Sequence, residues 1–536
     1  MCMINYDPLK KFALVLSLCL PVCVNAQDIK KPKDNWQNLD LKKDSVFGMS
    51  TEKAYDELLK GKPHQTVLVA VIDGGVDINH EDLKQVIWNN PGEKAGNHVD
   101  GDKNGYVEDL HGWDFIGSAK GDVHFDNMEQ TRQVRDYMVK YSKVDTNALT
   151  GKDLEDFNRF KKMRNDLTDK IKKADHTYGI ITRVNEILDG MVKRMAVTDP
   201  GVEDFKNYVP QDKAESYVKK VLVEHLGGYK NLADFRKNEI DEGLKHYGEQ
   251  LAFHYNVNFT SRDTVGDNYA DSGEHFYGNN DVTGPDADHG THVSGIIGAV
   301  RDNNIGVKGV ANDVAIMSVR TVPNGDERDK DVANAIRYAA GNGAKVINMS
   351  FGKSYSYDKK AVDEAVKFAM SKDVLIVHAA GNDNKNKDVE PNYPNRTYAD
   401  GSGTAQAWIE VGASGPTDDK TLKASFSNYG KNTVDVFAPG VKINSTTPNS
   451  TYALHDGTSM AAPAVTGLAA LIRSYYPKLT ALQVKEIIIK SVVKVDHKVA
   501  VKDAEGDGEH RMSFDEFCSS GGIVNAYNAL KLAATY

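Results

Sequence analysis

The sequence predicts an α/β fold of three layers, in which helices flank a mostly parallel sheet and an all-helical subdomain is inserted. Two observations favour this class. After residue 289, short apolar runs alternate with helical segments, which is typical of a parallel sheet covered on both faces. Before that point, the apolar residues of a long block follow helical spacing instead.

The elements follow in chain order. An apolar run that ends at Asp73 predicts the first buried strand, and later runs of four to six residues predict the others. The expected strands are 314–319, 346–349, 374–377 and 408–411, and the expected helices are 332–340, 362–370, 461–476, 481–491 and 522–534.

Residues 118–275 form the expected helical insertion. Two stretches have apolar residues three or four positions apart, and the sequence Asp-Pro-Gly at 199–201 interrupts the pattern before further helical stretches at 214–226 and 232–251. We expect four or five helices, charged on the outside, that bury their apolar faces against one another. A cap over a cleft, an internal inhibitor and a surface for partners are all compatible with such a block.

The composition favours a globular protein that does not bind nucleic acid. The 536 residues are 40% hydrophobic and 26% charged, enough for a large core, and the formal net charge is −10. A strongly negative chain without a basic stripe is unsuited to general nucleic-acid binding.

Residues 1–26 have the pattern of a secretory signal peptide. Lys10 and Lys11 precede a 13-residue apolar run, and cleavage is expected after Ala26, so the protein is expected to be periplasmic or secreted. A lipoprotein anchored at Cys23 ranks second, because Pro21 and Val22 suit that processing poorly. We expect no transmembrane segment in the mature chain, and Cys518 would be its only cysteine.

Three distant motifs supply an acid, a base and a nucleophile in that order. They are VIDGGV at 71–76, HGTHVSG at 289–295 and GTSMAAP at 457–463. A serine hydroxyl needs a base to accept its proton and an acid to orient that base, which suits Ser459, His289 and Asp73. The small residues around Ser459 predict a tight turn into a helix whose positive end favours a developing oxyanion.

This set of motifs resembles the subtilisin-like serine protease (subtilase) family, over residues 64–117 and 276–536. The resemblance implies a secreted endopeptidase with the triad Asp73, His289 and Ser459 and no catalytic cofactor. It implies that Asn382, in the sequence AAGN at 379–382, donates to the oxyanion. It also implies that protein or peptide substrates bind along Ser350, Phe351, Gly352, Ala379, Ala380 and Gly381, with Asn392 near the base of the pocket.

The chain departs from the family pattern at three places. Gly74 stands where the family has a serine or threonine that helps to hold the carboxylate, and Ala464 stands where a histidine is frequent. The N-terminal segment 27–63 is shorter than the usual foldable prodomain, so either the enzyme needs none or the helical insertion has taken over part of that role.

The sequence DGDKNGYVED at 100–109 places oxygen-bearing side chains on alternate residues before a glycine, as the first half of a calcium loop does. Subtilases commonly bind structural calcium, and the expected ligands here are Asp100, Asp102, Asn104 and Asp109. His111 stands where a glutamate would complete an EF-hand. An acidic, solvated turn is the alternative.

Two other functions stay open at this stage. An inactive subtilase scaffold used for binding is compatible with Gly74 and the large insertion. A metal-dependent hydrolase would use His289 and His292, although their spacing lacks the glutamate and the further ligand of the known zinc motifs. Side-chain preference and oligomeric state are not predicted.

Overall fold

The computed structural model describes residues 32–502 and 508–536. The expected signal peptide, 1–26, lies outside the described residues. The described chain forms two compact units, one over Gln130–Phe259 and the other over the residues before and after it.

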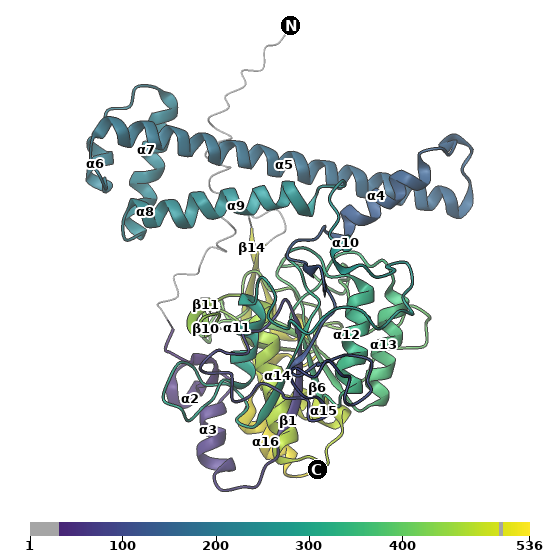
Figure 1. Cartoon of the computed structure of the whole chain (residues 1–536). Helices are drawn as coiled ribbons and strands as arrows, with labels where there is room; N and C mark the ends of the chain where they lie inside the picture. Colours follow the sequence, from purple (N-terminus) through teal and green to yellow (C-terminus); the bar gives the residue numbers. More distant parts are fainter. Residues whose placement is uncertain (1–31, 503–507) are drawn as a thin grey trace. The chain divides into compact units, whose positions relative to one another are not determined.

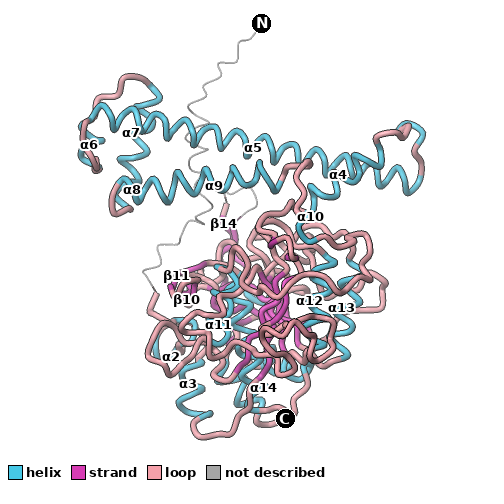
Figure 2. The backbone as a smooth tube through the Cα atoms, in the orientation of Figure 1, coloured by secondary structure: helices cyan, strands magenta, loops and turns pink. Residues whose placement is uncertain are grey.

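The larger unit is built on a nine-stranded sheet, drawn in magenta in Figure 2. All neighbouring strands are parallel except the pair β12 and β15. The order across the sheet is β12 (Val493–Lys494), β15 (Gly522–Ile523), β9 (Val436–Pro439), β8 (Trp408–Ser414), β7 (Leu375–Ala379), β6 (Val346–Met349), β1 (Val67–Asp73), β5 (Val314–Arg320) and β2 (Gly112–Asp114).

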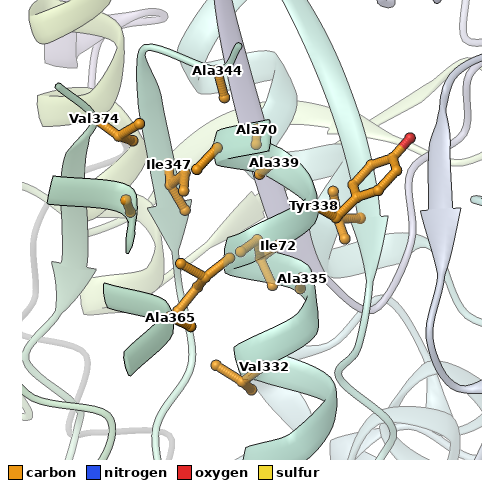
Figure 3. Close-up of a cluster of buried hydrophobic side chains, with 14 of the residues drawn as sticks. Ala70, Ile72, Val332, Ala335, Tyr338, Ala339, Ala344, Ile347, Ala365 and Val374 are labelled. Carbon is orange, nitrogen blue, oxygen red and sulfur yellow. The ribbon is translucent and has the colours of Figure 1, made fainter. Parts of the chain in front are cut away.

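Helices cover both faces of this sheet, as its almost wholly buried strands require. On one face, Ala70 and Ile72 of β1 pack in the same cluster as Ala335 and Ala339 of α12 (Asp329–Gly341), as Figure 3 shows, and α13 (Lys359–Ser371) completes this layer. On the other face, Thr466 of α14 (Thr458–Tyr475) donates to Asn348 of β6 at 2.9 Å. Helix α11 (Asp288–Gly298) packs against α14 on that side.

The expected α/β class with a mostly parallel sheet is therefore confirmed. The expected helix at 522–534 is wrong at its start. Gly522–Ile523 form β15, and α16 begins only at Ala526, where the side chain of Asn525 caps it by accepting from the N–H of Asn528. A short apolar run beside glycines is compatible with strand or helix, and pairing with β9 and β12 decides it.

Smaller elements complete the unit. Residues 32–63 pack onto it through buried Trp36, whose indole N–H donates to the carbonyl of Val441. The remaining elements are α2 (Leu41–Asp44), α3 (Thr51–Ala54), α10 (Arg262–Val265), α15 (Ala481–Lys490) and the hairpins β3 (Gly117–Ser118) with β4 (Gly121–Asp122), β10 (Ile443–Thr447) with β11 (Thr451–His455), and β13 (Lys498–Lys502) with β14 (Glu509–Ser513).

The other unit is helical throughout its described elements. They are α4 (Glu129–Tyr141), α5 (Gly151–Met195), α6 (Val202–Asn207), α7 (Lys213–His225), α8 (Leu232–Phe235) and α9 (Glu242–Glu249). The two apolar stretches before residue 199 belong to one 45-residue helix, α5, which packs against α7 and α9 (Figure 1). Residues 118–129 and 260–275 group with the sheet unit, so this unit is shorter than the block 118–275.

Within residues 32–502 and 508–536, no helix combines the length and the apolar composition that crossing a bilayer requires.

Candidate active site

Asp73 and His289 meet at the carboxyl end of the central strands. Asp73 is the last residue of β1, and His289 is the second residue of α11. The imidazole Nδ1 lies 2.8 Å from Oδ1 of Asp73, whose side chain is 3% exposed, whereas that of His289 is 42% exposed. The carboxylate therefore accepts from Nδ1–H, which leaves Nε2 of the neutral imidazole without a proton.

One backbone N–H and the imidazole of His289 hold the carboxylate of Asp73. The N–H of Gly74 donates to Oδ1 at 2.8 Å, while Oδ2 is buried and has no hydrogen-bond partner among the described residues. Position 74 cannot take a side chain freely, because a Cβ there would lie 3.1 Å from the carbonyl oxygen of Val322. Backbone donation thus replaces the hydroxyl that the family pattern places after the aspartate.

Arg320 fixes the same turn from the neighbouring strand. It pairs with Asp73 in the register of β1 and β5, and its Nε donates to the carbonyl of Gly74 at 2.8 Å. Asp114 binds its guanidinium at 2.6 Å and keeps this buried charge paired. Sequence reasoning missed Arg320. The signal that could have identified it is a charged residue at the end of a predicted buried strand, here the strand beside Asp73.

Two opposing effects set the basicity of His289. Burial lowers its pKa, but the negative charge of Asp73 and the hydrogen bond to it raise the pKa more, so the net pKa lies above the ordinary value for histidine. Asp286 and Asp288 act in the same direction more weakly.

Ser459 is the second residue of α14 and is anchored to Ser350. Pro463 has no N–H to donate to the carbonyl four residues earlier, so the carbonyl of Ser459 lacks its helical donor. The hydroxyl of Ser350 donates to this carbonyl at 3.0 Å, and Oγ of Ser459 donates to the carbonyl of Ser350 at 3.1 Å. Oγ makes no hydrogen bond to His289 in the described chain.

A cavity of about 410 Å³ lies beside Asp73 and His289. Asp73, His289, Ser350 and Phe351 all line it. The structure therefore brings the expected acid and base into contact, and Ser350, which is bonded to Ser459, lines the same cavity.

Asn382 follows β7 and is oriented by the residue before Ser459. Its Oδ1 accepts from both the N–H and the hydroxyl of Thr458, each at 2.9 Å. The side-chain Nδ2 makes no hydrogen bond to any described residue. An amide held by its oxygen presents its N–H groups to the space beside the start of α14.

The expected substrate residues lie at the ends of two adjacent strands. Ser350, Phe351 and Gly352 follow β6, and Ala379, Ala380 and Gly381 end or follow β7. Ala379 and Ala380 are buried, and the backbone groups of Ala380 are bonded to Val411 and Asn428. The carboxamide of Asn392 lies beside Gly352 and Gly381, since Cβ atoms placed on these glycines would be 2.9 and 3.7 Å from its Nδ2.

His292 has partners different from those of His289. Its Nε2 lies 3.1 Å from the carbonyl oxygens of Ile443 and Ala453, and its ring stacks on His455 at 4.1 Å. Burial, followed by the proximity of His455, lowers its pKa to about 3. Because the ring of His292 is buried against His455 and its Nε2 is bonded to carbonyl oxygens, His292 is poorly placed to share a metal with His289.

A carboxylate cluster forms near the expected calcium loop. Oxygen atoms of Glu93, Asp100 and Asp102 lie within 4.8 Å of one another. Asn104 donates to Asp102 at 3.2 Å and to Asp109 at 2.9 Å. Asp109 lies outside the cluster. It is buried and accepts from Tyr338 at 2.5 Å, and burial raises its pKa to about 6. Glu93 was missed because no local spacing links it to residues 100–104.

Comparisons with known proteins agree on one family. The family model described as Subtilase family (Peptidase S8) matches residues 64–512. Thermitase of Thermoactinomyces vulgaris is 42% identical over 187 residues, which are 35% of this chain and 61% of that protein. A thermophilic serine proteinase of Bacillus sp. strain AK1 is 42% identical over 35% of this chain and 42% of that protein.

Subtilisin Savinase of Lederbergia lenta is 38% identical over 198 residues, which are 37% of this chain and 67% of that protein. The matched segment thus spans less than two thirds of thermitase and less than half of the thermophilic serine proteinase. Because the family model matches most of the length of this chain, the chain belongs to the subtilase family.

Proposed function

We propose that the protein is a serine endopeptidase that cleaves proteins or peptides through an acyl-enzyme. The observation that carries this proposal is the 2.8 Å contact between Asp73 and His289 on the cavity lined by Ser350, which anchors Ser459. Membership of the subtilase family supports the same chemistry.

The first step is attack by Ser459. The hydrogen bond from Oγ to the carbonyl of Ser350 breaks. Oγ then forms a covalent bond to the carbonyl carbon of the substrate and gives its proton to Nε2 of His289. Asp73 keeps the proton on Nδ1 and stabilises the imidazolium that results. His289 then donates the proton to the departing amine, and attack by water releases the acyl group by the same steps.

The developing oxyanion is stabilised by donors near the start of α14. Nδ2 of Asn382 is unengaged, while Thr458 holds its Oδ1. Ser459 belongs to the first helical turn, whose N–H groups lack intrahelical acceptors. One such donor contributes about 3 kcal/mol to the stability of the transition state. Substrate backbone would lie along Ser350–Gly352, opposite Ala379–Gly381.

Replacing Ser459 by alanine tests this function. The variant S459A is expected to lose peptide hydrolysis while its circular dichroism and melting temperature match the wild type. Wild-type hydrolysis by S459A would refute the mechanism. An inactive wild-type chain that still binds peptides would instead identify a scaffold.

We also infer that the loop at 93–104 holds a structural calcium ion. The donor set fits, because three carboxylates supply the oxygen ligands that calcium prefers. Asn104 instead donates from Nδ2 to Asp102, and its Oδ1 accepts from the N–H of Tyr106 at 2.8 Å. Glu93, Asp100 and Asp102 would hold the ion. It would neutralise their repulsion and fix the loop, and the reaction itself needs no cofactor.

Residues 1–26 are proposed to direct the protein to the periplasm or the exterior, with cleavage after Ala26. N-terminal sequencing of the exported protein should begin at Gln27.

A further inference from the structure

A second cavity, of about 320 Å³, lies next to the proposed substrate-binding glycines. Asn392 lines it and also contacts the positions where Gly352 and Gly381 would carry side chains. Tyr393, which lines it too, exchanges backbone hydrogen bonds with Lys353. The exposed residues Pro391 and Thr397 also line the cavity, so it reaches the surface.

The cavity contains a largely buried cation that makes no close ion pair. Lys387 is 7% exposed, yet its ammonium has no hydrogen bond and no carboxylate within ion-pair distance in the described chain. Glu410 faces the same cavity, but its oxygens accept from Nδ1 of His378 at 3.0 Å and from the indole of Trp408 at 2.9 Å. Glu410 attracts the ammonium from beyond ion-pair distance, and a buried charge without a close partner is costly.

The other cations of the cavity are neutralised. Nη1 of Arg396 donates to both carboxylate oxygens of Asp435, and Lys359 is paired with Asp363 at 2.6 Å. Lys387 is therefore the cation that remains available for a ligand.

Asn392 adds a second unused polar group. Its Oδ1 is buried without a hydrogen-bond partner, and its Nδ2 makes no hydrogen bond to a described residue. An amide can rotate to present either atom, so its two N–H donors are available to an acceptor in the cavity.

Lys387 keeps its charge at neutral pH. Burial lowers its pKa to about 8, and the attraction of Glu410 limits the decrease. The ammonium form thus predominates at pH 7.

We propose that this cavity is a carboxylate-binding site in which the ammonium of Lys387 and the carboxamide of Asn392 donate to the two oxygens of one carboxylate. The inference rests on the proposed peptidase function, because the expected source is an acidic side chain of a substrate that lies along Gly352 and Gly381. A free small carboxylate has the same chemistry and is the second source.

The test compares the wild type with K387M, which keeps an unbranched side chain one atom shorter and removes its charge. Lys385 is exposed and pairs with Glu390, so K385M is the matched control. Peptides that differ only in Glu or Gln at the residue whose carbonyl is attacked give kcat/KM ratios. Melting curves in increasing succinate at constant ionic strength measure binding of the free carboxylate.

Binding of a substrate side chain predicts that the wild type and K385M favour Glu over Gln by about tenfold, because a charge-assisted hydrogen bond is lost with Gln. K387M should cleave both peptides equally. Binding of the free carboxylate predicts that succinate raises the melting temperature of the wild type and K385M but not that of K387M. Absence of both effects would overturn the inference.

The variant K387M also separates this inference from the proposed function. It should still hydrolyse the Gln peptide and react at Ser459 with a fluorophosphonate. If no variant, including the wild type, hydrolyses any peptide, the peptidase function fails, and the succinate titration still decides whether a carboxylate binds.

Discussion

The candidate active site has two ends: the joined end, formed by Asp73 and His289, and the serine end, formed by Ser459 and Asn382. They differ in whether the functional groups are already in hydrogen-bond contact. Asp73 and His289 are in hydrogen-bond contact at 2.8 Å, and backbone groups and Arg320 fix the turn below them. Ser459 instead donates to the carbonyl of Ser350. The proposed acid and base are thus in contact, whereas the proposed nucleophile is bonded to the end of a neighbouring strand.

The largest expected effect comes from removing His289, the base that would take the proton of Ser459. H289A removes the only proposed acceptor of the serine proton and should reduce kcat for peptide hydrolysis by about 10⁶-fold. His124 lines the same cavity and lies 3.8 Å from Asp286, so H124A is the matched control and should retain most activity. Equal losses in both variants would contradict the role of His289.

The joined end can be broken separately with D73N. An amide no longer favours the Nδ1–H tautomer of His289, and kcat should fall by about 10⁴-fold while the fold is kept. The neighbouring carboxylate variant D286N, which leaves Oδ1 of Asp73 in place, should lose far less. A D73N enzyme with near wild-type kcat would show that the 2.8 Å contact does not orient the base.

Asn382 tests the serine end with a smaller expected loss. N382D preserves an oxygen that accepts from Thr458 but removes the Nδ2 donor, so kcat should fall about 10²- to 10³-fold. T458V removes the hydroxyl that bonds Asn382 and leaves the donor in place. A larger loss in T458V than in N382D would assign Asn382 to holding the turn rather than to the oxyanion.

The pH profile measures the charge of Asp73 directly. Because His289 acts as a base when neutral and its pKa is raised, kcat/KM should increase with pH through a midpoint above the ordinary histidine value of about 6.5. In D73N the raising charge is gone and burial remains, so the midpoint should move to lower pH. An unchanged or higher midpoint in D73N would contradict this assignment.

Calcium removal should lower the stability of the fold and leave the contact between Asp73 and His289 unchanged. Chelation is expected to lower the free energy of unfolding by about 2 to 3 kcal/mol, as loss of a ligand at 100 times its Kd would, and calcium should restore it. The double variant D100N/D102N should no longer respond, whereas D271N, in an exposed loop, should respond like the wild type. Abolition of the reaction of Ser459 in chelated but folded protein would instead favour a catalytic metal.

The sequence predicted where residues of both ends lie better than it predicted their supports. Asp73, of the joined end, ends an apolar run and Asn382, of the serine end, follows one, so local patterns located them at the edge where parallel strands end. Two supports could not be predicted from periodicity. The bonds between Ser350 and Ser459 link segments far apart in the sequence, and the approach of Glu93 to Asp100 occurs between loop residues. Tertiary pairing also decided that Gly522–Ile523 is a strand.

Labelling by a fluorophosphonate tests most directly whether Ser459 is activated by Asp73 and His289. Wild-type protein should gain one adduct, which mass spectrometry locates at Ser459, and H289A should gain none under the same conditions. Equal labelling of wild type and H289A, or an adduct at another serine, would contradict the account.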